Sequence, residues 1–166
     1  MKRMQSFICR IVLAVLFRAL KFLNRKDTRM KAGFSAYEDG YSFRIRAGME
    51  SGAPVLSFCV RNGQLEKQSH EVPVQLEITM KSIPDAFLVL TGQLGIGASY
   101  AGHRFFMRGN PNEAMGLVTC LELAEAYLFP RFLSRRLMLD VPKKEFPALL
   151  VYAGLICPGG LSRTGR

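Results

Sequence analysis

The sequence predicts an α+β fold built around a mainly antiparallel sheet. Three observations lead to this class. Apolar and polar residues alternate with a period of two in several central segments, which is typical of half-buried strands. Helical periodicity replaces this alternation towards both ends of the chain. Between two strand-like segments, the pair Asn62-Gly63 predicts a tight hairpin, because both residues tolerate a positive φ.

Four segments carry the strand pattern. The first runs from Tyr41 to Ala47, where apolar residues alternate with serine and arginine. Residues 56–60 and 74–80 repeat the alternation, and residues 104–108 form a shorter segment that directs Phe105 and Met107 to one side. Each segment therefore offers one apolar face to a core and one polar face to water.

The first predicted helix, residues 5–23, is amphipathic. A narrow basic stripe faces a wide apolar surface, and the longest run without a charge, Ile11 to Phe17, is far below the roughly 20 residues of a membrane span. Two interpretations remain open: the helix lies on a membrane surface, or it docks on the domain itself. For the first we expect membrane contacts from Arg10, Arg18, Lys21, Phe7, Ile11 and Phe22.

Further helices are expected along the chain. Residues 24–33 are predicted to be a charged connector, residues 84–91 a short helix, and residues 92–102, with their four glycines, a mobile connection. Asn110 is expected to cap a helix that begins at Pro111 and ends near residue 128, with Glu113 completing a capping box. A last short apolar helix is expected near residues 146–154.

The charge distribution suggests the domain organisation and the kind of partner. The net charge is +10, yet residues 32–130 hold more acids than bases, so the basic residues lie at the two ends. We expect a basic helix and connector at residues 1–32, the main domain at 33–130, a basic and apolar helical extension at 131–157, and a disordered tail at 158–166. Basic ends beside apolar helices suit an anionic membrane surface better than nucleic acid, and no nucleic-acid partner is expected.

Catalytic equipment is scarce. The four cysteines lie far apart, without the spacing of a zinc or redox motif, and only His70 and His103 are present. We therefore predict a protein that is not an enzyme and that has no metal site and no cofactor. A pairing of Cys59 or Cys120 with His103 is the minor alternative. The acids Glu122 and Glu125 are expected to lie on a solvated helix face.

The order of these elements resembles the SCP2 (sterol carrier protein 2) family of lipid-binding domains over about residues 41–128. The resemblance rests on VRNGQLEKQ after a strand, on VQLEITMKSIPDAFLVLTGQLG, and on the strand-to-helix turn in FFMRGNPNEAMGL. It implies about five strands with helices over one face, and an apolar tunnel between the two layers. The chain departs from the family in having no Trp in the second strand, no peroxisomal C-terminal address, and basic helices at both ends. The YLFP segment, residues 127–130, has no assigned role.

From this resemblance we predict non-catalytic binding or transfer of an apolar lipid, of sterol, fatty acyl or isoprenoid type, in an internal pocket at or near a membrane surface. The alternative is an accessory protein that presents a polyprenyl, quinone-type intermediate to a partner enzyme. The expected location is cytoplasmic and peripherally membrane-associated, with the 92–102 segment as the gate. The predicted pocket wall consists of Phe43, Ile45, Leu56, Phe58, Val60, Leu76, Ile78, Met80, Phe87, Leu90, Phe105, Met107, Met115 and Leu117.

Overall fold

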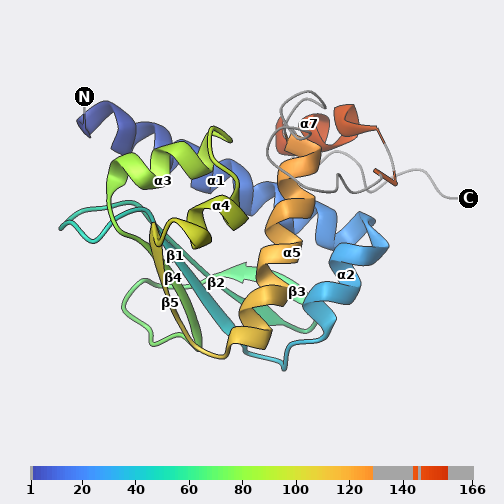
Figure 1. Cartoon of the computed structure of the whole chain (residues 1–166). Coiled ribbons are helices and arrows are strands. Elements are labelled where there is room, and N and C mark those ends of the chain that lie inside the picture. Colours follow the sequence, from blue (N-terminus) through green and yellow to red (C-terminus); the bar gives the residue numbers. More distant parts are fainter. Residues whose placement is uncertain (1, 129–143, 146, 157–166) are drawn as a thin grey trace, which may run out of the picture.

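The computed structural model describes residues 2–128, 144–145 and 147–156 of the 166-residue chain. Figure 1 shows a sheet with helices packed above it and beside it. In chain order the elements are α1 (Lys2–Lys26), α2 (Thr28–Ser35), β1 (Ser42–Arg46), β2 (Val55–Arg61), β3 (Gln64–Lys67), β4 (Leu76–Met80), α3 (Ile83–Leu90), α4 (Ile96–Ala101), β5 (Phe105–Arg108), α5 (Pro111–Leu128) and α7 (Ala148–Ile156). None of the described helices is both long and apolar enough to cross a bilayer.

The sheet has five strands in the order β3-β2-β1-β4-β5. All neighbouring strands are antiparallel except β1 and β4, which run parallel. The register places Phe43 opposite Phe58 and Ile45 opposite Ile78, so that the apolar residues share one face. This arrangement confirms the predicted α+β class, the mainly antiparallel sheet and the Asn62-Gly63 turn, where both residues have positive φ.

Helix α1 docks on the domain through the buried part of its apolar surface. Its buried residues include Cys9, Leu13, Leu16, Leu20 and Leu23, and they belong to the same hydrophobic cluster as the strand residues. The helix packs against α2, α3, α5 and α7, and also against β2 and β3. The predicted boundary between residues 1–32 and 33–130 therefore does not separate two cores.

Aromatic rings fill the space between α1, α2 and the sheet. Phe43 and Phe58 stack with ring centroids 5.0 Å apart, and both are fully buried. Phe34 of α2 meets each of them edge-on, and Phe17 of α1 lies 5.8 Å from Phe58. Close packing of this kind leaves no room for a guest. The part of the interlayer space that lies under α1 and α2 is thus solid core.

Two predicted connectors are helical. The charged connector at residues 24–33 contains the end of α1 and most of α2, because the Asp27 carboxylate caps α2 by accepting hydrogen bonds from the backbone N–H groups of Arg29 and Met30. The 92–102 segment, predicted to be a mobile gate, contains the short helix α4, which buries Ser99. Sequence reasoning missed both because it treated charge and glycine as signs of a loop.

The start of α5 follows the prediction in part. Pro111 is its first residue, and the Asn110 side chain accepts a hydrogen bond from Asn112 N at 3.0 Å. The predicted capping box is wrong, because the Glu113 carboxylate instead accepts a hydrogen bond from the Tyr41 hydroxyl. Tyr37 also donates to the backbone oxygen of Glu113 at 2.6 Å. Two tyrosines therefore tie the first turn of α5 to the segment that leads into β1.

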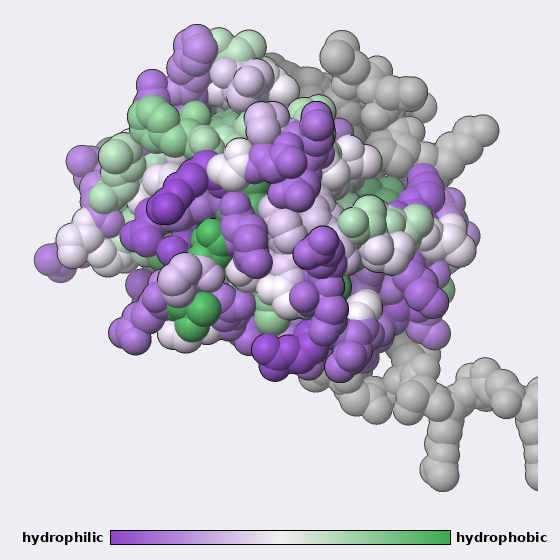
Figure 2. Space-filling view, turned by 90° about the horizontal axis from the view of Figure 1, so that it is seen from below, coloured by the Kyte–Doolittle hydropathy of each residue, from purple (hydrophilic) through white to green (hydrophobic). Residues whose placement is uncertain are grey.

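The other face of the sheet is polar. Glu77 lies 3.6 Å from the Arg46 guanidinium and 3.9 Å from that of Arg44. Arg44 also donates to the backbone oxygen of Val72, which holds part of the β3–β4 connection against the sheet. Figure 2, a view from below Figure 1, shows a mainly hydrophilic surface in which hydrophobic residues occur in separate groups.

Candidate functional site

An apolar groove of about 360 Å³ lies among α1, α3, α5 and α7. This volume falls in the lower part of the range of about 300–1,000 Å³ that is typical of ligand pockets. The lining residues are Ile11, Val12, Val15, Leu16, Leu90, Thr91, Glu125, Leu128 and Tyr152. Most of these side chains are aliphatic, so the groove is suited to a hydrocarbon group.

Helical spacing explains how the groove forms. Ile11, Val12, Val15 and Leu16 recur at the steps of an α-helix and so lie on one side of α1. The C-terminal ends of α3 and α5 form another wall of the groove, to which they contribute Leu90 and Leu128. Leu16 and Leu90 are buried, whereas Ile11 is 47% exposed at the rim. The groove therefore runs from the edge of the core to the surface of the molecule.

Glu125 is the exceptional residue of the groove. Burial, together with the nearby Glu122 carboxylate, raises its pKa to about 8. Neither acid has an ion-pair or hydrogen-bond partner in the part of the chain that the structure describes. The prediction that Glu122 and Glu125 lie on a solvated face is wrong, since both side chains are half-buried and burial also raises the pKa of Glu122. At neutral pH Glu125 is therefore mainly protonated.

The predicted pocket wall lies mostly outside this groove. Of its fourteen residues, only Leu90 lines the groove, and Leu56 lines a more polar cavity of about 190 Å³ beside Arg10 and His70. The other predicted β1, β2 and β4 residues are buried in the core, as is Leu117, while Phe87, Phe105 and Met107 pack against it. Met115 is 62% exposed, because it lies on the outer side of α5, so its predicted place in an internal wall is wrong.

The outer side of α1 carries the residues predicted to contact a membrane. Arg10 and Arg18 are exposed, Lys21 and Phe22 are half-buried, and Phe7 is 63% exposed. Arg18, Lys21 and Phe22 line a basic hollow of about 380 Å³ together with Ala14, Phe17, Arg25 and Lys67. Docking of α1 on the domain thus uses its buried side and leaves the basic stripe accessible.

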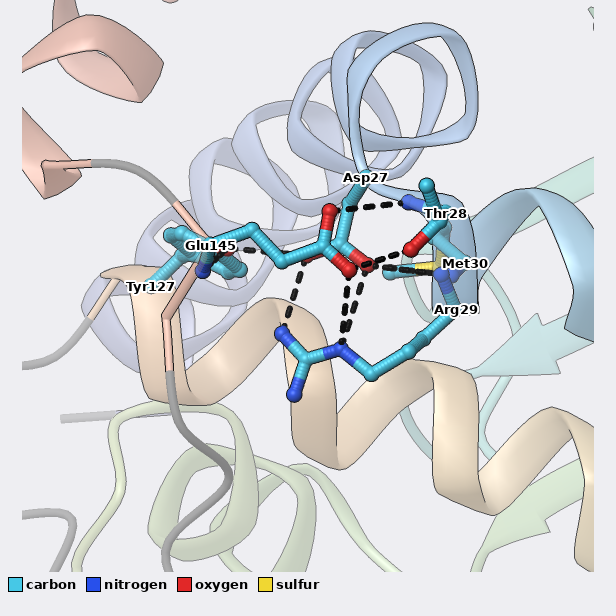
Figure 3. A network of polar contacts seen from close by, with 6 residues as sticks. All are labelled: Asp27, Thr28, Arg29, Met30, Tyr127 and Glu145. Carbon is cyan, nitrogen blue, oxygen red and sulfur yellow. Dashed lines mark hydrogen bonds and ion pairs between the residues drawn. The ribbon is translucent and has the colours of Figure 1, made fainter.

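A polar cluster that the sequence reasoning missed joins the start of α2, the end of α5 and residue 145. Figure 3 shows the cluster around Asp27, whose carboxylate is buried. Asp27 accepts a hydrogen bond from the Tyr127 hydroxyl at 2.8 Å and forms an ion pair with Arg29 at 3.0 Å. Tyr127 in turn accepts a hydrogen bond from Glu145 N at 2.8 Å, and the Glu145 carboxylate accepts one from Thr28 N at 3.1 Å.

The hydrogen bonds of this cluster stabilise the charged form of the Asp27 carboxylate, which suits a structural role. Burial alone would raise the pKa of Asp27, but the hydrogen bonds from Arg29, Tyr127 and Met30 outweigh it and hold the pKa below its ordinary value. The cluster also gives a role to the first residue of the YLFP segment, since Tyr127 is fully buried and joins α5 to the start of α2. Residues 129 and 130 of that segment lie outside the described residues.

The candidate catalytic groups are poorly placed for chemistry. Cys59 and Cys120 are buried, and burial raises the pKa of Cys120 to about 12, which leaves its thiol protonated. His103 is exposed in the turn before β5, and no described contact joins it to either cysteine. The described residues contain no group of three or more His, Cys, Asp or Glu side chains that would hold a metal ion.

Comparison with known proteins identifies the fold. No protein-family model matches the sequence, and no curated protein is similar to it in sequence. The structure is similar to a protein described as "UbiJ-SCP2 Ubiquinone synthesis protein", with a TM-score of 0.51 and 14% identity over 69% of this chain and 96% of that one. It is also similar to apo Sterol Carrier Protein 2 from Yarrowia lipolytica, with a TM-score of 0.46 and 13% identity over 70% and 91% of the two chains. The first comparison confirms the predicted SCP2-like fold.

Proposed function

We propose that the chain is a non-enzymatic lipid-binding protein that holds the apolar part of a lipid in the groove among α1, α3, α5 and α7. The observation that carries this proposal is the groove itself, with its largely aliphatic lining and a volume of about 360 Å³. Removing hydrocarbon from water contributes about 25 cal/mol per Å² of apolar surface, so such a groove supplies affinity without specific polar contacts.

The position of the groove suits a ligand that comes from a membrane. Ile11 both lines the groove and lies 47% exposed on the outer side of α1, on the same helix as the basic stripe. Tyr152 of α7, also on the rim, is 40% exposed, and its neighbour Leu149 is 79% exposed. A lipid tail that leaves a bilayer at this face would reach the groove without crossing water.

Lipid binding in the groove is tested by filling it. The substitution Val15→Trp places a large ring among the lining residues, and Ala14→Trp places the same ring one position away, at an exposed site outside the groove. Binding of a tritium-labelled C20 isoprenoid alcohol is expected to fall at least tenfold in Val15→Trp and to stay near the wild-type value in Ala14→Trp. Equal binding by both variants would place the ligand elsewhere.

Membrane contact is a separate part of the proposal and has its own test. Arg10, Arg18 and Lys21 would approach anionic head groups, each contributing roughly 1 kcal/mol near such a surface. Reversing all three charges to Glu is expected to abolish flotation with vesicles that contain phosphatidylglycerol. Charge reversal at Lys31, Lys81 and Arg108, which are exposed outside α1, is the matched control. Salt-insensitive flotation of both triple variants contradicts the membrane contact.

A second candidate function is favoured by one comparison. The similar structure described as a ubiquinone synthesis protein aligns over 96% of its length with this chain. In this version the chain is an accessory protein that presents a polyprenyl, quinone-type intermediate to a partner enzyme, and the basic face of α1 binds the partner. Native mass spectrometry after mild extraction distinguishes the two. A retained lipid without a partner supports a carrier, and a retained isoprenoid in a stoichiometric complex supports a presenter.

A further inference from the structure

The polar groups that line the groove differ in whether they already form a hydrogen bond within the protein. The Thr91 hydroxyl donates to the backbone oxygen of Phe87 at 2.6 Å, and the Tyr152 hydroxyl donates to the backbone oxygen of Leu128. Glu125 forms no hydrogen bond or ion pair with any residue that the structure describes. A half-buried carboxyl in an apolar wall is costly to leave unpaired, so its presence points to a partner other than the described residues, and a ligand in the groove would be one.

The surroundings of Glu125 determine which partner fits. Around the groove, α1 and α3 contribute no charged side chain, and α7 contributes only the phenol of Tyr152. Among the described charged groups, the one that shifts the pKa of Glu125 is a second carboxyl, Glu122. An anionic head group would find no cation among the described lining residues and would lie against the Glu125 carboxyl, with Glu122 nearby. The basic residues of α1, by contrast, line the separate hollow beside β3.

A protonated carboxyl has a defined hydrogen-bonding capacity. It donates one O–H bond and accepts others at its carbonyl oxygen. It therefore pairs with a hydroxyl, a phenol or a ketone, each of which offers a hydrogen-bond acceptor and carries no charge. A ligand with such a head and a hydrocarbon tail would satisfy Glu125 and the aliphatic wall at the same time.

Building on the proposed function, we propose that Glu125 is the head-group residue of the groove, and that the groove selects a lipid with an uncharged hydrogen-bonding head over a lipid carboxylate or phosphate. The volume of about 360 Å³ holds the head and the first part of a tail, and the remainder of a longer tail would lie beyond the rim at Ile11. Fatty acids, which the sequence left open as ligands, are thereby disfavoured.

The test compares two lipids that differ only in the head. Geranylgeraniol and geranylgeranoic acid share the same C20 chain, and equilibrium dialysis at pH 7 measures both. The wild type is expected to bind the alcohol at least tenfold more tightly than the acid, which corresponds to one hydrogen bond and the avoided repulsion. In Glu125→Leu the preference is expected to disappear, with weaker binding of the alcohol and stronger binding of the acid.

A second variant separates hydrogen bonding from a general effect on the fold. Glu125→Gln keeps a donor and an acceptor but cannot ionise, so binding of the alcohol is expected to stay within about threefold of wild type. Glu66→Leu, an exposed acid on β3, controls for the change in net charge. Equal binding of the two lipids by the wild type and by Glu125→Leu overturns the head-group proposal while leaving lipid binding intact. Binding of neither lipid by the wild type means that the proposed function fails as well.

Discussion

The substitution Glu125→Gln tests the unusual ionisation of the groove carboxyl through protein stability. The pKa of this glutamate rises from 4.5 to about 8 on folding, because the folded chain buries it among apolar residues and near Glu122. Between these two values the unfolded chain releases the proton and the folded chain keeps it. The wild type therefore loses stability as the pH rises from about 4.5 to 8, since the unfolded state binds fewer protons.

The magnitude follows from the size of the shift. Each pKa unit corresponds to 1.36 kcal/mol, so at pH 7 the protonated carboxyl costs the folded state at most about 3 kcal/mol, and above pH 8 at most about 5 kcal/mol. Glutamine does not ionise, and Glu125→Gln removes this cost. For a chain of this size the gain at pH 7 amounts to a rise in Tm of roughly 6–12 °C.

Urea denaturation followed by far-UV circular dichroism measures the effect. At pH 4.5 wild type and Glu125→Gln are expected to have nearly equal free energies of unfolding, and the difference is expected to grow as the pH rises to 8.5. Glu38→Gln, at an exposed position, is the control and is expected to show no such growth. A difference that is constant over this pH range would refute the argument, because it would mean that Glu125 ionises with an ordinary pKa in the fold.

Three further predictions concern the anchors of the fold. Tyr127→Phe removes the hydroxyl that joins Asp27 and Glu145, and thermal denaturation is expected to show a loss of about 1–3 kcal/mol. Asp27→Asn is expected to destabilise the chain at pH 7 by a similar amount. The difference in free energy of unfolding from wild type is expected to narrow below pH 3.8, because the wild-type carboxylate also becomes protonated there. A difference that stays constant in acid titrations would contradict the lowered pKa of Asp27. Gly109→Ala is expected to cost about 1–3 kcal/mol, because its φ is +129° and a Cβ would lie 2.6 Å from a backbone oxygen, whereas Gly97→Ala, with open space around it, is expected to be neutral or slightly stabilising. Equal denaturation midpoints for these two glycine variants would contradict the backbone argument.

Local patterns in the sequence were sufficient for most of the strands and helices, although not for α2 and α4. The alternation around Phe43 and Ile45 placed β1, and the Asn62-Gly63 pair placed the turn between β2 and β3, because side-chain periodicity and positive φ are properties of neighbouring residues. Pro111 marked the start of α5 for the same reason. The order of the elements, together with the motifs quoted above, was also sufficient to recognise the SCP2-like fold that the structural comparison confirms.

These local patterns could not predict where in the fold a ligand-sized cavity lies. The amphipathic pattern of α1 was equally compatible with a membrane and with the domain, and only the fold shows that Phe17 and Phe34 occupy the space over the sheet where a tunnel was expected. The groove arises instead where four helices that are distant in sequence meet.

The burial and the raised pKa of Glu125 depend on the same tertiary contacts. In the sequence it is one of two acids spaced three residues apart, a pattern typical of a solvated helix face. The structure places it opposite Val12 and Val15, more than a hundred residues earlier, and this burial raises its pKa. Periodicity is a local property and can be read from the chain, whereas cavities and desolvation depend on which distant side chains come together, and those appear only in the folded molecule.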